Sequence, residues 1–210
     1  MLLLIVVGIV VIVGALFVAS VKKQATDAGE TTDALHQLSF DSQTVYRPIR
    51  RLIKEIEAEL EKQDSPAIRA TRSMTLEELQ ATNQRIVEAL KSRDELRKAS
   101  EKYPEAAREA DRLLAEKEKA DSPGLALSFA KAYEAKLGEL DQHNQARDII
   151  KRIDAEINLT QAKLGELKAR ISVASTNTDA AASAEDLRST LQSLEVLHQS
   201  IDEVETMIRS

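Results

Sequence analysis

The residues of this chain that could do acid–base or metal chemistry are three histidines and many carboxylates. The histidines are His36, His143 and His198, and their spacing matches none of the short intervals by which histidines share a metal ion. His198 lies between Leu194 and Ile201 in an apolar helical repeat. It is either a pH-sensitive residue that sets helix register or a tolerated polar residue at a partly hydrated contact. The second interpretation is favoured, because single polar residues are ordinary in coiled coils.

The carboxylates are spaced as they are on helix surfaces. Glu55, Glu57, Glu59 and Glu61 stand among lysines and arginines, which favours solvated faces over a general acid–base pair. The chain has no cysteine, and no phosphate-binding, zinc-protease or serine-hydrolase motif. We therefore expect no enzymatic activity, no catalytic or metal-binding residue, no cofactor and no small-molecule substrate.

A basic cluster occurs in the stretch YRPIRRLIKEI. Helical spacing places its basic side chains on one side and its apolar side chains on another. One interpretation is contact with anionic lipid headgroups or with an acidic partner helix. The other is a charged outer face balanced by Glu55, Glu57 and Glu59, and it is favoured because the basic run is short. The basic residues are Arg47, Arg50, Arg51 and Lys54.

The first 21 residues carry no charged side chain. As a helix they would reach about 31 Å, enough to cross a hydrocarbon core. A signal peptide usually begins with basic residues and has an apolar part of roughly 7–15 residues. A retained anchor is therefore favoured over a cleaved signal, although the small residues at 18–20 are compatible with cleavage. The apolar anchor residues are Leu2, Leu3, Leu4, Ile5, Val6, Val7, Ile9, Val10, Val11, Ile12, Val13, Leu16, Phe17 and Val18.

Two lysines predict the orientation of this anchor. Lys22 and Lys23 are the only basic residues in the first 46 positions, and they follow the apolar run. Because positive charge stays on the cytoplasmic side of a span, the bulk of the chain is expected in the cytoplasm.

Beyond the anchor the sequence predicts an all-α protein, with helices near 32–62, 75–101, 105–119, 124–173 and 184–208. The motif Asp-Ser-Pro at 64–66 and at 121–123 suits helix starts, and Thr75 has the spacing of a capping box. Gly138 and the stretch 141–144 are candidate interruptions of the longest helix. Apolar residues with alternating steps of three and four predict seams that another helix must cover. The seam residues are Ile150, Ile153, Ile157, Leu164, Leu167, Ile171, Leu194, Leu197, Ile201, Val204 and Ile208.

These elements divide the chain into an anchor (1–21), a juxtamembrane linker (22–31), a helical or coiled-coil region (32–174), a second linker (175–183) and a C-terminal amphipathic helix (184–210). The net charge of −6 argues against nucleic-acid binding. We expect a membrane-anchored scaffold or adaptor that acts through protein contacts at the cytoplasmic membrane face. Its partner would be another protein or a second copy of the chain, held through the seams. A sensor accessory and an exported helical protein are the alternatives.

Overall fold

The computed structural model describes residues 37–177 and 179–209, and this part of the chain is helical throughout, without strands. The helices are α2 (Phe40–Lys62), α3 (Pro66–Ser100), α4 (Tyr103–Lys119), α5 (Pro123–Thr176) and α6 (Ala180–Arg209). The all-helical prediction is thereby confirmed. The proposed anchor (1–21) and Lys22 and Lys23 lie outside the described residues. None of the described helices contains a stretch long and apolar enough to cross a bilayer.

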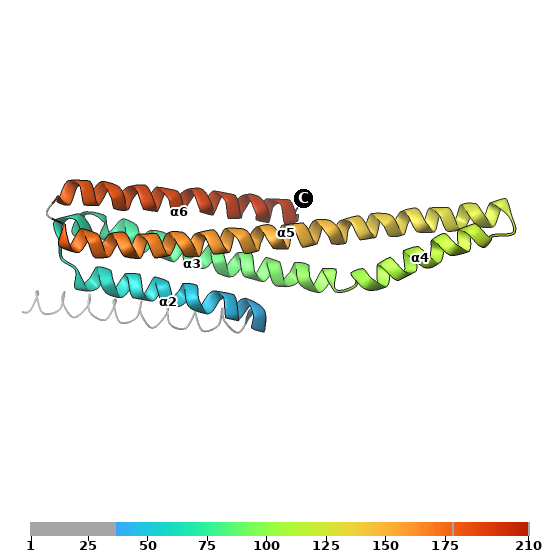
Figure 1. Ribbon diagram of the computed structural model, residues 1–210, viewed down its shortest axis with the longest axis horizontal. Helices are drawn as coiled ribbons and strands as arrows, with labels where there is room; N and C mark the ends of the chain where they lie inside the picture. Colours follow the sequence, from blue (N-terminus) through green and yellow to red (C-terminus); the bar gives the residue numbers. More distant parts are fainter. Residues whose placement is uncertain (1–36, 178, 210) are drawn as a thin grey trace, which may run out of the picture.

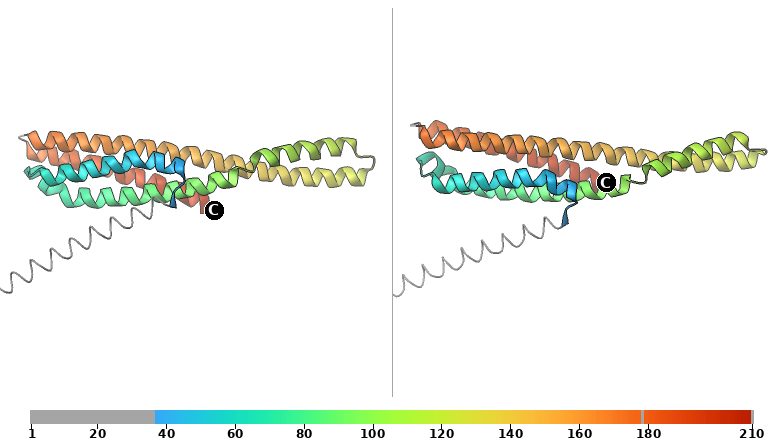
Figure 2. Two further views of the ribbon diagram at one scale, coloured as in Figure 1. Left: turned by 90° about the horizontal axis from the view of Figure 1, so that it is seen from below. Right: turned by 60° about the horizontal axis from the view of Figure 1, so that its bottom comes forward.

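The helices form a four-helix bundle from which a two-helix arm extends (Figures 1 and 2). The bundle consists of α2, α3, α6 and the second half of α5. Both α2 and α6 pack against α3 and α5, and they lie on opposite sides of that pair (Figure 1). The arm consists of α4 and residues 123–149 of α5, which pack against each other and project beyond the bundle.

Serine side chains cap the starts of α3 and α5, as the Asp-Ser-Pro motifs predict. The Ser65 Oγ accepts the N–H of Ile68 at 3.4 Å at the start of α3, and the Ser122 Oγ accepts the N–H of Leu125 at 3.3 Å at the start of α5. In both cases proline follows at the first helical position, where its missing N–H costs no hydrogen bond.

The prediction that a helix begins at Thr75 is wrong, because α3 begins at Pro66. Thr75 is buried inside this helix, and its hydroxyl donates to the carbonyl oxygen of Thr71 at 2.8 Å. The same bond to the preceding turn is made by the buried hydroxyls of Thr71, Thr82 and Thr160. A threonine that satisfies its own hydroxyl in this way can occupy an apolar seam.

Helix α5 is continuous over 54 residues, a length of about 81 Å. Gly138 and the stretch 141–144 therefore do not interrupt it. At its far end the connection to α6 is much shorter than the expected linker (175–183), since α5 continues to Thr176 and α6 begins at Ala180. The Asp179 carboxylate accepts the N–H of Ala182 at 3.0 Å. Asp179 therefore caps the start of α6 directly after this short connection.

The apolar stripes of the bundle helices meet in one continuous core. Residues from all of its helices are fully buried there, with 0% exposure; they include Tyr46, Ile49, Ile56, Ile68, Leu79, Ile86, Leu90, Ile157, Leu164, Leu167, Ile171 and Leu194. The core thus lies entirely within the bundle, and the arm carries no comparable cluster.

Candidate interaction surfaces

The seam residues lie mostly inside the bundle. In α5, the side chains from Ile153 to Ile171 that follow the repeat are at most 3% exposed, and in α6 those from Leu194 to Val204 are at most 8% exposed. Ile150 and Ile208, which stand nearer the arm, are half-buried. Helices of the same chain cover these seams, so a second copy is not needed to bury them.

His198 occupies a seam position and is buried, at 3% exposure. Its Nε2 lies 2.8 Å from the Thr82 Oγ1, whose own proton goes to the carbonyl oxygen of Glu78. The ring must therefore donate from Nε2, which assigns the proton to that nitrogen. On the other side, the Nδ1 faces an Arg85 Nη1 at 3.3 Å and a Glu78 Oε1 at 3.1 Å.

The surroundings of His198 oppose its protonation. Burial and the positive charge of Arg85 lower the pKa of His198 to about 4, against a smaller effect from Asp202. Burial and the nearby carboxylate of Glu195 raise the pKa of Glu78. In this contact between α3 and α6, the surroundings therefore disfavour both the imidazolium form of His198 and the carboxylate form of Glu78. The interpretation of His198 as a hydrated polar seam residue is too simple, since its hydrogen bonds are made by protein groups.

A second buried polar network lies where α2 begins. The Asp94 carboxylate accepts three bonds, from the Ser39 N–H at 2.8 Å, from the Ser39 hydroxyl at 2.7 Å and from the Ser42 hydroxyl at 2.7 Å. Arg93 donates to the Ser42 Oγ at 3.0 Å and pairs with Asp154 of α5 at 2.6 Å. Burial alone would raise the pKa of Asp94, but the bonds from Ser39 and Ser42 and the charge of Arg93 together lower it. The network fixes the start of α2 on α3 and α5.

Sequence reasoning did not find this network, yet the sequence carries a sign of it. The stripe Ile86–Leu90 continues by a step of three to Arg93, which puts a charged side chain at a seam position. Arg93 and Asp94 are 5% and 8% exposed. A charged pair at the end of an apolar stripe indicates buried partners on another element.

The basic cluster lies on α2, with its members differently placed. Arg47, Arg51 and Lys54 are exposed, whereas Arg50 is half-buried. Burial raises the pKa of Tyr46, and the positive charge of Arg50 lowers it by a smaller amount. Two of the three acidic residues expected to balance the basic cluster, Glu55 and Glu59, form bonds to α5. Glu55 accepts from the Lys168 Nζ at 2.7 Å, and Glu59 accepts from the Ser172 hydroxyl at 3.3 Å.

The arm is held together by half-buried and polar contacts. Tyr103 and His143 meet edge to face with ring centroids 6.0 Å apart, and the Arg147 guanidinium lies 5.6 Å from the Tyr103 ring centroid. Lys136, at a seam position, forms ion pairs with Glu109 and Glu139. The arm leaves Leu125 and Leu127 near its tip 47% and 59% exposed, so its surface offers both charged and apolar groups to a partner.

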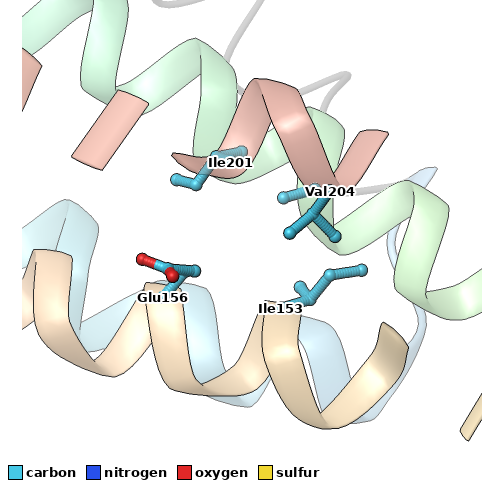
Figure 3. Close-up of a pocket in the computed structure, with 5 residues that line it drawn as sticks. Ile153, Glu156, Ile201 and Val204 are labelled. Carbon is cyan, nitrogen blue, oxygen red and sulfur yellow. The ribbon is translucent and has the colours of Figure 1, made fainter. Parts of the chain in front are cut away.

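One small gap opens between α5 and α6, beside α3 (Figure 3). Ile153, Ile201 and Val204 line it with Ala89 and Glu156, and it is too narrow to hold a water molecule. The Glu156 Oε1 accepts from the Ser200 hydroxyl at 2.8 Å. This gap is a packing defect of the core rather than a ligand pocket.

In the described ranges, no group of three or more His, Asp or Glu side chains could hold a metal ion. Comparisons with protein-family models, curated proteins and solved structures give no match to this chain.

Proposed function

We propose that this chain is a membrane-anchored helical scaffold, which holds a protein partner at the cytoplasmic membrane face. The single observation that carries the proposal is that an uncharged run of 21 residues precedes a long helical region, α2 to α6. The run has the length and composition of a span. The body presents long side-chain surfaces and a projecting arm, which suit contacts with macromolecules.

The orientation rests on Lys22 and Lys23, which follow the apolar run and favour a cytoplasmic body. The partner surface is assigned to the arm. The seams that another protein or a second copy was expected to cover are enclosed within the chain, whereas Leu125 and Leu127 are exposed near the arm tip. Exposed leucines at the end of a projecting arm fit a helical partner or a groove in another protein.

The anchor is tested on the full chain in cell membranes. It should resist extraction at alkaline pH, and its intact mass should include residues 1–21. Because the chain has no cysteine, a single Lys131→Cys on the arm reports topology through a membrane-impermeant maleimide. Labelling is expected only after the cells are opened. Labelling of intact cells would reverse the orientation, and loss of residues 1–21 would replace the anchor by an exported protein.

The scaffold role is tested by a photo-cross-linking amino acid at Leu127. We expect a cross-link to one discrete protein partner, and none from the matched exposed position Gln192 on α6. Leu127→Glu should abolish co-purification of that partner without lowering the thermal stability of the bundle, since the residue lies on the arm. Equal cross-linking from both positions would remove the arm as the partner surface.

A further inference from the structure

Between residues 42 and 54 the charged residues on the exposed side of α2 are all basic. Arg47, Arg51 and Lys54 follow helical steps of four and three and are all exposed. The opposite side buries Tyr46 and Ile49 in the core. From residue 42 to residue 54 the chain has no Asp or Glu. We call Arg47, Arg51 and Lys54 the basic stripe.

Two carboxylates of α2, on either side of the stripe, pair with other helices. Glu55 is bonded to Lys168 of α5, which lowers the pKa of Glu55 with a smaller contribution from the charge of Arg51. At the start of the helix, Asp41 pairs with Arg97 of α3. The carboxylates of Glu55 and Asp41 therefore lie beside α5 and α3. The basic stripe is on the side of α2 that faces away from the bundle.

The far side of the bundle has the opposite charge. Helix α6, across α3 and α5 from α2 (Figure 1), exposes Glu185, Glu195 and Glu203. A negatively charged surface would therefore attract the α2 side and repel the α6 side. The two faces give the bundle a preferred orientation toward such a surface.

We propose that the basic stripe of α2 lies against the anionic lipid headgroups of the membrane that the N-terminal run enters. This inference rests on the anchor of the proposed function. Between the end of that run at Val21 and Leu38, whose side chain is buried in the bundle, are 16 residues, 22–37, which reach at most about 58 Å when extended. The linker is therefore long enough to let α2 lie flat on the bilayer that the run crosses.

The chemistry suits phosphate headgroups. The two arginines can each offer paired N–H donors to phosphate oxygens, and the lysine adds a compact charge. Three charges bind a membrane weakly by themselves, but an anchored chain holds the stripe at high effective concentration. Because α2 runs along the bundle, this contact would lay the bundle and arm along the membrane (Figure 2).

The test uses the full chain reconstituted in vesicles of phosphatidylcholine alone or with phosphatidylserine added. A single Ala58→Cys, exposed one turn beyond Lys54 on the same side of α2, carries a fluorophore, and quenchers are attached to the lipid headgroups. Quenching at residue 58 should rise when phosphatidylserine is present. It should fall in 1 M salt, where charge–charge attraction is screened beyond about 3 Å. The matched label at Gln192→Cys on α6 should respond to neither.

Charge reversal provides the matched variants. Arg47→Glu, Arg51→Glu and Lys54→Glu together should abolish the phosphatidylserine-dependent quenching, since each basic residue near the surface is worth about fivefold in binding. The control reverses Arg108, Lys117 and Lys119, which are exposed on α4, by the same total charge. It should quench as the parent does, and both variants should keep the parent's helicity and melting temperature.

The outcomes separate this inference from the anchor. If the chain floats with neutral vesicles but residue 58 is quenched equally in both compositions, the anchor stands and the lipid contact is overturned. If the chain does not float with neutral vesicles, the anchor fails, and flotation with anionic vesicles alone would still support the stripe. Concentration-dependent pairing of chains that the stripe reversal abolishes, without a lipid effect, would assign the stripe to α6 of a second copy and overturn the proposal.

Discussion

Both halves of α5 carry less exposed residues at helical steps of three and four, but the two halves pack in different ways. In the bundle half, Ile157, Leu164 and Leu167 are fully buried, because three other helices enclose them. In the arm half, Phe129, Tyr133 and Leu140 are only half-buried, because among the described helices α4 alone packs along this half. A seam becomes a core only when enough helices surround it.

The composition of each half fits its number of neighbours. The arm seam includes Lys136 and His143, whose polar ends reach other charged groups at its edge. In α4 the buried residues are Ala106 and Ala110, small side chains that allow two helices to approach closely. The bundle half instead uses Ile and Leu. We infer that the bundle carries most of the stability and that the arm is a separate, weaker unit.

The largest expected effect comes from placing a carboxylate in each seam. Ile157→Asp should lower the free energy of unfolding by about 4 kcal/mol or more, because the charge has no water and no partner at that position. Leu140→Asp in the arm should cost about 1 kcal/mol, since its carboxylate can turn to solvent. Urea unfolding of the full chain in detergent, followed by circular dichroism, measures both. Equal losses would mean that the arm is enclosed as tightly as the bundle.

Acid should weaken the bundle through His198. Its pKa in the folded chain is about 4, below the ~6.5 of an unfolded histidine. Between these values the unfolded chain binds a proton that the folded chain does not. The contribution of His198 to the free energy of unfolding is therefore fully present above pH ~6.5. It is lost as the pH drops toward 4, by at most about 3 kcal/mol.

Two substitutions identify the source of that pH dependence. His198→Gln should flatten the decline, because Gln can still donate to Thr82 but does not titrate. The raised pKa of Glu78 acts in the opposite direction, since the folded carboxyl takes up its proton at a higher pH than the unfolded one. Glu78→Gln should therefore steepen the decline. If His198→Gln leaves the decline unchanged, His198 is not the source of the pH dependence.

The helical repeat and the helix starts were predictable because they depend on local sequence. Steps of three and four identified the residues from Ile153 to Ile171, and serine before proline identified the start of α5. The helix predicted from Thr75 instead begins at Pro66. The division of α5 between a bundle and an arm was not predictable, since it depends on how many helices lie beside each half. Thr75 was misassigned because the same hydroxyl can cap a helix or bond inside one.

The polar network at the start of α2 allows a smaller, sharper comparison. Asp94→Ala should lower the free energy of unfolding by about 2–3 kcal/mol, because it leaves three donors without their acceptor. Asp94→Asn keeps an acceptor and should cost less. In the arm, Glu139→Ala removes an exposed partner of Lys136 and should change the unfolding midpoint within the error of measurement. A loss at Glu139 as large as that at Asp94 would contradict the division into a strong and a weak unit.

Two glycines, one in each half of α5, allow a comparison by small stabilising changes. Gly138 and Gly165 are both helical, and a Cβ added at either would meet no atom within 4 Å. Alanine should therefore stabilise each site by about 0.5–1 kcal/mol through its better helix propensity. If the arm opens separately from the bundle, Gly138→Ala should slow amide hydrogen exchange only in residues of the arm. Gly165→Ala should instead slow the most protected amides of the bundle, since these exchange only on global unfolding. If both variants slow the same amides by the same factor, α5 and its partners unfold as one cooperative unit.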